Sequence, residues 1–429
     1  MDSLVRIQII YYRNSYQWAH IAKVGTSPGY IWTMNFEKIN VDHFNYSLPE
    51  EKIAQFPLDN RDESNLLIFL DKKIQHALVK ELPDWISKLS HPNLVLNDTR
   101  VVPARLIFSR GENIKPIEIF YMDPVNGSIE DAMQSKKSLK AWCKVRNSKK
   151  WKHNLILKRE NLTASKLGQN GDKFQILFSW NSEDNWSEIL QKNGETPLPP
   201  YMKRPSNKND NERYQTVFSK VEGSVAAPTA GLHLTSKMLN KIQKNSKINY
   251  VQLHIGAGTF QPISENTISK HEMHSEEVHF SIETIESLKE NKDILAVGTT
   301  SARALESLYW LSLELFNGNE EIFSIDQWAP YKNYDKFLSR DESLIFLTNY
   351  MRRNKKKSLH FNTSIIIIPG YKFKFIDLIL TNFHQPKSTL LLLIAAAIGN
   401  DWRKVYDYAL ENNYRFLSYG DACLLKIKT

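Results

Sequence analysis

Four short segments combine glycine, hydroxyl, amide and histidine side chains next to apolar runs. The segment LHIGAGTFQP (253–262) carries His254, and the backbone at Gly256 and Gly258 could approach a ligand closely, with Thr259 adding a hydroxyl. Glycines after a strand also serve simply to turn the chain. The segment APTAGLHLT (227–235) places two further candidates, Thr229 and His233, ahead of an expected helix at 236–243.

A second kind of loop, VGTTSAR (297–303), runs from an expected strand into an expected helix. One hydroxyl is enough to cap a helix N-terminus. The sequence offers Thr299, Thr300 and Ser301, followed by Arg303. The surplus hydroxyls, the free N–H groups and the guanidinium predict a site for a carboxylate or phosphate.

The segment TNFHQPKSTLLLL (381–393) ends a strand with Asn382 and His384 and opens an apolar helix with Lys387, Ser388 and Thr389. A cation at a helix N-terminus is electrostatically unfavourable unless an anion lies between them. The pattern therefore predicts an anionic ligand at this helix.

The segment HEMHSE (271–276) could supply a metal site or acid–base groups. The zinc-protease helix needs HExxH, whereas the spacing here is HExH, so we expect no metal. The remaining interpretation assigns His274 and Glu276 to proton transfer or substrate binding.

The charge balance favours a polyanionic partner. Lys and Arg number 56 against 47 Asp and Glu, a net charge of +9, which attracts nucleic acid. Basic residues at positions 144 to 152 lie around Trp142 and Trp151. This pattern suits phosphate contact and base stacking. A second basic run, 352–357, is equally well explained as a solvated loop.

Composition limits the other classes. Hydrophobic residues make up 41% of the 429 residues, enough for a packed core in two or three domains. The longest apolar run, Leu390–Ile398, is about half of the ~18 residues that cross a membrane, and no signal peptide is visible. Two cysteines make no disulfide framework, so we expect a cytoplasmic protein.

The expected elements define an α/β protein with an inserted small β-barrel. Short β-type runs at 115–121, 140–145 and 173–178 predict the barrel, at 94–185. Strands at 250–255, 294–298, 364–368 and 376–381, with helices at 283–291, 301–315 and 390–398, predict a mostly parallel sheet formed by 34–93 and 186–429. Residues 1–33 are expected to be an N-terminal extension that need not be ordered, and 315–360 a polar excursion.

Ten motifs in order resemble the S-adenosylmethionine:tRNA ribosyltransferase-isomerase family of queuosine biosynthesis. They lie between about Phe44 and Leu425 and cover about nine tenths of the chain: NDTRVVPARL, PLPPYMKRP, ERYQTVF, VAAPTAGLHLT, LHIGAGTFQP, HEMHSE, VGTTSARALES, PGYKFKFID, LTNFHQPKSTLLLL and YRFLSYGDACLL. Leu234, Gln385 and Ala302 depart from the family's usual Phe, Leu and Val.

The resemblance implies transfer and isomerisation of the ribosyl group of S-adenosylmethionine onto 7-aminomethyl-7-deazaguanine at the tRNA wobble position. Epoxyqueuosine-tRNA forms, and adenine and methionine leave. S-adenosylmethionine is then a co-substrate, and no permanently bound cofactor is expected. The substrate amine is the nucleophile, so proton-transfer groups are needed in place of a covalent nucleophile.

These residue types give the candidate site. The proton-transfer candidates are His233, His254, His274 and His384. The substrate-binding candidates are Thr229, Gly256, Gly258, Thr259, Glu276, Thr299, Thr300, Arg303, Asn382, Lys387, Ser388 and Thr389. The tRNA-binding candidates are Arg100, Lys144, Arg146, Lys149, Lys150, Lys203, Arg204 and Arg213.

Two other functions stay open. A tRNA-binding paralogue could keep the scaffold with lost or altered activity, although so many titratable groups at strand ends favour an enzyme. A metal-dependent hydrolase depends on HEMHSE alone. The oligomeric state is open, with a monomer expected.

Overall fold

The computed structural model describes residues 39–89, 92–152, 154–256, 263, 265, 267–290, 293–319 and 322–428. The expected extension at 1–33 lies outside these ranges, as do the candidate residues Gly258 and Thr259. Within these ranges no helix is long and apolar enough to cross a membrane.

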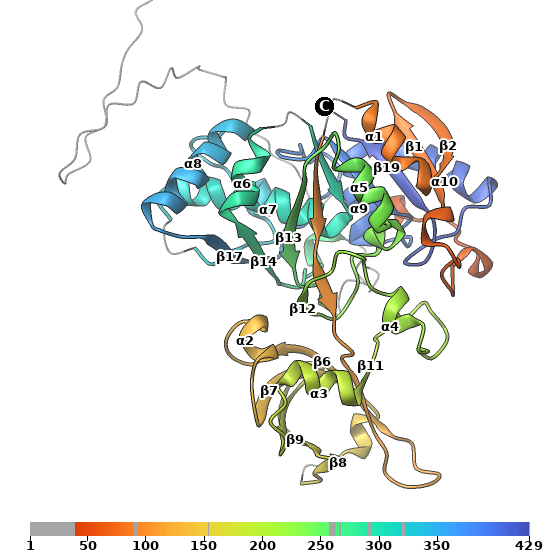
Figure 1. The fold of residues 1–429 in the computed structure, drawn as a ribbon, viewed down its shortest axis with the longest axis vertical. Coiled ribbons are helices and arrows are strands. Elements are labelled where there is room, and N and C mark those ends of the chain that lie inside the picture. Colours follow the sequence, from red (N-terminus) through yellow and green to blue (C-terminus); the bar gives the residue numbers. More distant parts are fainter. Residues whose placement is uncertain are drawn as a thin grey trace, which may run out of the picture. The chain divides into compact units, whose positions relative to one another are not determined.

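A ten-stranded sheet carries most of the chain (Figure 1). Its strands, in spatial order, are β16 (Ser324–Ile325), β17 (Ser358–Thr363), β14 (Glu276–Ser281), β13 (Ile248–Leu253), β3 (Asn93–Asn97), β15 (Ile294–Val297), β18 (Leu378–Asn382), β19 (Ala422–Lys426), β1 (Asn65–Leu70) and β2 (Lys73–Leu78). The four neighbours β13, β3, β15 and β18 are parallel, whereas β14 with β17 and β18 with β19 are antiparallel. Two outer pairs, β16 with β17 and β19 with β1, are also parallel. The sheet is therefore mixed, and the expectation of a mostly parallel sheet holds without interruption for the four central strands.

Helices cover both faces of this sheet, so its central strands are mostly apolar and buried. Strand β15 reads ILAV and is fully buried. Alternate residues of the strands pack into two clusters. One contains α6 (Ile282–Leu288), α7 (Thr299–Phe316), α8 (Arg340–Arg353), α9 (Thr389–Ile398) and α10 (Asp401–Glu411), and the other α1 (Leu82–Ser87) and α5 (Ser236–Ile242).

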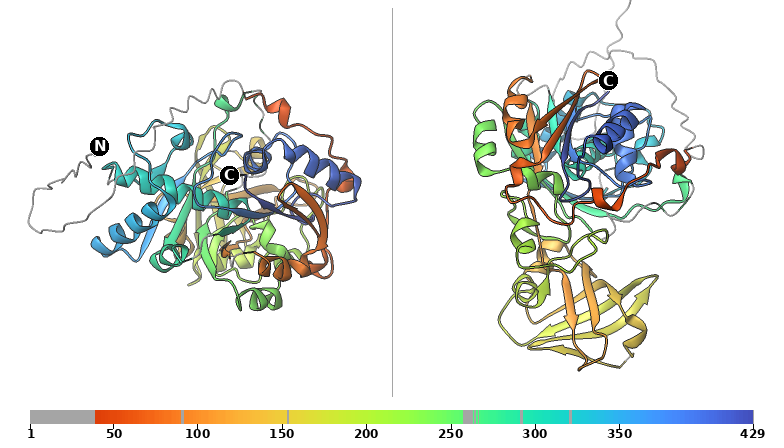
Figure 2. Two further views of the ribbon diagram at one scale, coloured as in Figure 1. Left: turned by 90° about the horizontal axis from the view of Figure 1, so that it is seen from above. Right: turned by 90° about the vertical axis from the view of Figure 1, so that its right-hand side faces the viewer.

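A second, seven-stranded antiparallel sheet forms the insertion (Figure 2). Its spatial order is β11 (Gly194–Glu195), β5 (Arg105–Phe108), β6 (Ile117–Pro124), β7 (Ser138–Arg146), β10 (Lys173–Trp180), β9 (Leu162–Asn170) and β8 (Leu157–Arg159). The helices α2 (Ile129–Met133) and α3 (Trp186–Asn193) contribute to its core.

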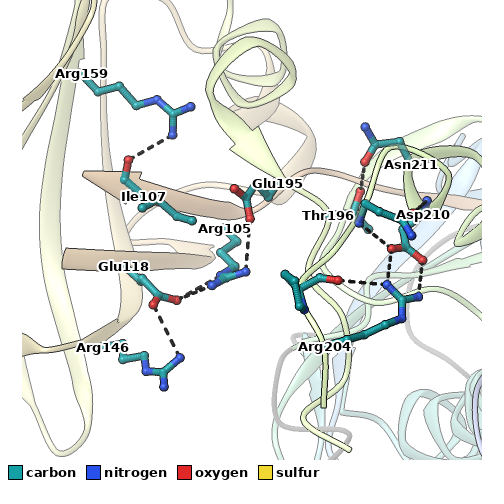
Figure 3. A network of polar contacts seen from close by, with 12 residues as sticks. Arg105, Ile107, Glu118, Arg146, Arg159, Glu195, Thr196, Arg204, Asp210 and Asn211 are labelled. Carbon is teal, nitrogen blue, oxygen red and sulfur yellow. Dashed lines mark hydrogen bonds and ion pairs between the residues drawn. The ribbon is translucent and has the colours of Figure 1, made fainter. Parts of the chain in front are cut away.

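Side-chain contacts, in place of a strand ladder, hold the ends of this small sheet. Arg159 on β8 donates to the Ile107 carbonyl of β5 at 3.1 Å, so the sheet curls until the edge strand β8 reaches β5, the neighbour of the opposite edge strand (Figure 3). Arg105 joins Glu118 and Glu195 at 2.7 and 3.2 Å, and thereby links three strands. The insertion is a curled half-barrel.

The insertion leaves the large sheet at its centre. Strand β3 continues into β4 (Thr99–Val101), which pairs in parallel with the returning strand β12 (Val221–Ser224) (Figure 1). Strand β3 itself lies between β13 and β15. The strands of the small sheet extend from Arg105 to Glu195, compared with the expected barrel at 94–185. A short helix, α4 (Asp210–Arg213), follows the insertion.

Two expectations about the C-terminal half are wrong. Residues 364–368 are buried but extended without a ladder, and the strand is β17, just before them. The polar segment 315–360 does not leave the main domain, because it contains α8, whose Leu344, Leu347 and Met351 pack into the main core. The polar residues of this segment lie on the outer face of α8 and dominate its composition, so the apolar stripe of the helix was not recognised in the sequence.

Candidate functional site

A pocket lies at the carboxyl ends of the neighbouring strands β15 and β18. Open α/β sheets bind ligands at this edge because loops and helix N-termini converge there. The segments 227–230, 298–300 and 381–388 contribute to its wall together with Ile255 of the segment 253–262, so all four loops singled out from the sequence reach it. The lining residues are Tyr201, Ala227, Pro228, Thr229, Ala230, Ile255, Gly298, Thr299, Thr300, Thr381, Asn382, Phe383, His384, Gln385, Ser388, Leu390, Leu417 and Ser418.

Asn382 is a hub within this wall. Its Oδ1 accepts a hydrogen bond from the Thr229 hydroxyl at 2.8 Å. Its Nδ2 lies 3.1 Å from His233 Nε2 and 3.4 Å from the Asp421 carbonyl. This arrangement leaves the Thr229 oxygen as an acceptor, and it makes His233 Nε2 an acceptor, with the ring proton on Nδ1. Burial lowers the pKa of His233 to about 4, so the ring is neutral.

His384 is the histidine that lines the pocket. Its Nε2 lies 3.0 Å from the Thr381 hydroxyl, and its backbone N–H donates to the Tyr406 hydroxyl at 3.1 Å. The Tyr46 hydroxyl donates to its carbonyl. Burial lowers the pKa of His384 to about 3, so a neutral ring faces the pocket at neutral pH.

The N-terminus of α7 supplies free donors. Gly298 caps this helix at φ 90° with no side-chain capping bond, a conformation that glycine adopts readily. The Thr300 hydroxyl, buried at the pocket, has no partner among the described residues. One turn later, Arg303 forms an ion pair with Glu276 of β14 at 2.5 Å. The donors at the N-terminus of α7 can therefore bind an acceptor group.

Two residues at α9 do not present free groups to an anion. The Ser388 hydroxyl caps α9 by accepting from the Leu391 N–H at 3.2 Å, and it donates to the Gln385 carbonyl. Lys387 forms an ion pair with Asp42 at 2.5 Å. The expected anion beside the lysine is thus a carboxylate of the protein itself.

The other two histidines lie apart from the pocket wall. His254 is buried after β13, where its Nδ1 has no partner among the described residues, and burial together with His279 lowers its pKa to about 4. His274 precedes β14, and its pKa is lowered by partial burial and by the charges of Lys173 and Lys144. In the described ranges, no three His, Cys, Asp or Glu residues are placed to hold a metal.

Comparisons with known proteins decide the family. The family model described as "Queuosine biosynthesis protein" matches residues 41–425. The chain belongs to the queuosine biosynthesis family. A protein from Sulfurihydrogenibium sp. (strain YO3AOP1), named S-adenosylmethionine:tRNA ribosyltransferase-isomerase, is 35% identical over 396 residues, covering 90% of this chain and all of that protein. One of the same name from Finegoldia magna is 34% identical, covering 90% and 98%.

A solved structure is also similar to this family member. It is a crystal structure of an S-adenosylmethionine tRNA ribosyltransferase from Thermotoga maritima. The identity is 26%, the TM-score is 0.42, and the match covers 89% of this chain and 99% of that one.

Sequence reasoning did not single out two residues that line the pocket. Tyr201 and Ser418 line it and share a hydrogen bond at 2.5 Å. They come from PLPPYMKRP and YRFLSYGDACLL, which the resemblance singled out as motifs. A tyrosine between prolines and a serine after a leucine give no chemical signal, so only the fold brings them to the site.

The candidate RNA contacts fall into two groups. Arg204 is largely buried and donates to both carboxylate oxygens of Asp210 (Figure 3). It also donates to backbone carbonyls, including that of Gln55 at 2.8 Å. Arg213 likewise donates to the Leu58 and Asp59 carbonyls. These two arginines hold the chain that returns from the insertion. The exposed group comprises Arg100, Arg146, Lys149, Lys150 and Lys203, whereas Lys144 is half-buried beside Asp172.

Proposed function

We propose that this chain transfers and isomerises the ribosyl group of S-adenosylmethionine onto 7-aminomethyl-7-deazaguanine at the tRNA wobble position. The match of residues 41–425 to the family, together with full-length relatives that carry the activity in their names, supports this function. S-adenosylmethionine is a co-substrate in this proposal, and no permanent cofactor takes part.

The pocket at β15 and β18 supports binding of S-adenosylmethionine. The N-terminus of α7 and the unpartnered Thr300 hydroxyl suit the methionine carboxylate, because a helix N-terminus favours negative charge. The Thr229 oxygen, with its proton given to Asn382, suits a ribose hydroxyl. Because the positive charge of Arg303 is already balanced by Glu276, Arg303 would contribute to a ligand as a hydrogen-bond donor more than as a counter-charge.

We assign proton abstraction from the carbon beside the sulfonium to His384. A base must be neutral before it acts, and the ring of His384 is neutral and lines the pocket. His233 lies behind Asn382, where its Nε2 is already an acceptor, so it positions the hub. The Thr381 hydroxyl at 3.0 Å fixes the orientation of the His384 ring.

The RNA would lie along the exposed cations of the small sheet. Arg146, Lys149 and Lys150 lie on β7 or in the turn after it, and Arg100 lies on the connection to the large sheet. We place the protein in the cytoplasm, with its tRNA, as a monomer.

Incubation with S-adenosylmethionine and an anticodon stem-loop bearing 7-aminomethyl-7-deazaguanine tests the function. Adenine and methionine should appear, and the mass of the RNA should rise by that of the transferred ribosyl-derived group. Release of S-adenosylhomocysteine would show methyl transfer and refute the proposal. Tight binding of the stem-loop without any product would favour the alternative, a tRNA-binding paralogue without this activity.

A further inference from the structure

Arg303 carries an unmet hydrogen-bonding requirement. Its side chain is about nine-tenths buried, and Nη1 donates to Glu276. Nε and Nη2 have no partner among the described residues. Buried donors are nearly always paired, because an unpaired one keeps its full desolvation cost. The free edge of this guanidinium therefore points to a ligand with an acceptor oxygen or nitrogen.

A carboxylate of the small sheet lies close enough to Glu276 of this ion pair for their charges to interact. Asp123 on β6 follows an irregularity in the pairing of β6 with β7, between Tyr121 and Asp123. Bulges of this kind re-aim side chains and are common beside active sites. In the described part of the chain, the Asp123 carboxylate makes no hydrogen bond or ion pair, and its charge interacts with those of Lys173 and Glu276.

These residues come from both sheets. Asp123 belongs to the insertion, whereas Glu276 and Arg303 belong to the large sheet and α7. Contacts between the two parts continue alongside, since the Ile129 N–H donates to Glu277 at 3.3 Å. Thr300, one helical turn before Arg303, lines the pocket, so this cluster adjoins the expected S-adenosylmethionine site.

We propose that Asp123, Glu276 and Arg303 form the subsite for the modified base: the carboxylates receive its aminomethyl ammonium group, and the free edge of Arg303 donates to its ring carbonyl. The inference rests on the proposed function. An alkyl ammonium requires acceptors, and a guanine-type ring offers a carbonyl oxygen to a guanidinium. The cluster supplies both in one place.

The subsite also prepares the nucleophile. A primary ammonium has no free electron pair and must lose a proton before it can attack. In this step an N–H bond of the ammonium breaks, an O–H bond forms on Asp123, and the nitrogen keeps the electron pair. Burial and the neighbouring Glu276 raise the pKa of Asp123 above its usual value, which makes it a better acceptor than an exposed aspartate.

A binding comparison tests the subsite independently of turnover. Two anticodon stem-loops, one with 7-aminomethyl-7-deazaguanine and one with guanine at the wobble position, are titrated into the full-length protein. The wild-type protein should prefer the aminomethyl loop, and Asp123→Asn should reduce that preference by about ten- to a hundredfold, the range expected for a charge-assisted bond. The affinity for S-adenosylmethionine and the melting temperature should stay unchanged.

The chain offers a matched control, Asp172→Asn. Asp172 is an exposed aspartate of the same small sheet, paired with Lys144, so its replacement changes the net charge equally. This variant should keep the full preference. Asp123→Ser is a second probe that removes the carboxylate with a smaller side chain, and it should behave as Asp123→Asn does.

Two results would overturn the subsite. The first is an Asp123→Asn protein that still prefers the aminomethyl loop as strongly as the wild type. The second is a wild-type protein that turns over the aminomethyl loop yet binds both loops equally. Failure of the proposed function looks different: the wild type would then give neither product nor preference.

Discussion

Replacing Arg303 by alanine should destabilise the whole protein. Arg303 is 6% exposed and Glu276 3% exposed, so the substitution removes the Arg303 counter-charge from a buried carboxylate. Breaking a buried ion pair in this way costs about 3–5 kcal/mol, mainly because the remaining charge stays desolvated. Removing both partners should cost less than the sum of the single substitutions, by about 0.5–3 kcal/mol.

Urea denaturation of the wild type, Arg303→Ala, Glu276→Ala and the double variant measures these free energies of unfolding. The exposed pair of Arg352 and Glu286 gives the control, because Arg352 is 64% exposed and surface ion pairs contribute at most about 1 kcal/mol. Arg352→Ala should therefore be nearly neutral. Strict additivity of the two buried substitutions, or a loss below about 1 kcal/mol for Arg303→Ala, would refute this account of the ion pair.

Three further predictions concern the hub, acid stability and RNA binding. Asn382→Asp places a negative charge 3.1 Å from His233 Nε2 and should raise the pKa of His233 above about 4, and a histidine NMR titration with an unmoved pKa would contradict this. Because the pKa values of His233 and His384 are lowered to about 4 and about 3, stability should be complete above the unfolded pKa of ~6.5; it should fall as the pH drops towards those values, by about 1.4 kcal/mol per pKa unit for each ring, and equal unfolding midpoints at pH 7 and pH 4.5 would exclude this. Lys149→Ala with Lys150→Ala should weaken RNA binding and lower the slope of log affinity against log salt by roughly 0.7–0.9 for each phosphate that the lysines neutralise, and an unchanged slope would remove both lysines from the RNA interface.

The sequence predicted the elements whose pattern is set by burial. The stripe of 301–315 became α7, and the apolar run at 390–398 became α9, because uniformly apolar or strictly periodic segments have only one way to bury themselves. The helix α8 was not predicted, since its polar outer face dominates its composition. The apolar run at 364–368 has the composition of a strand, but no strand is assigned there, although Ser364 and Ile366 donate backbone hydrogen bonds to the Ile325 and Gln327 carbonyls.

The site was predictable where chemistry leaves a local signature. Thr300 and Asn382 were singled out because their hydroxyl and amide groups lie at the ends of expected strands, and Thr229 because it precedes an expected helix. The fold brings all three to one pocket. The ion pair of Lys387 with Asp42 could not be foreseen, because the two residues lie 345 positions apart in the sequence. Asp123 was not singled out for the same reason, because its proposed role depends on residues of the large sheet that are far away in the sequence.

The position of β19 affects how the protein can be made. This strand lies between β18 and β1 and pairs Ala422–Leu425 with Leu66–Phe69, so the large sheet stays in two pieces until β19 has left the ribosome. Until then, two apolar strand edges are open, and open edges template aggregation. A nascent chain stopped before β19 would expose both edges at once. Chaperone occupancy during synthesis should therefore persist until β19 has been made.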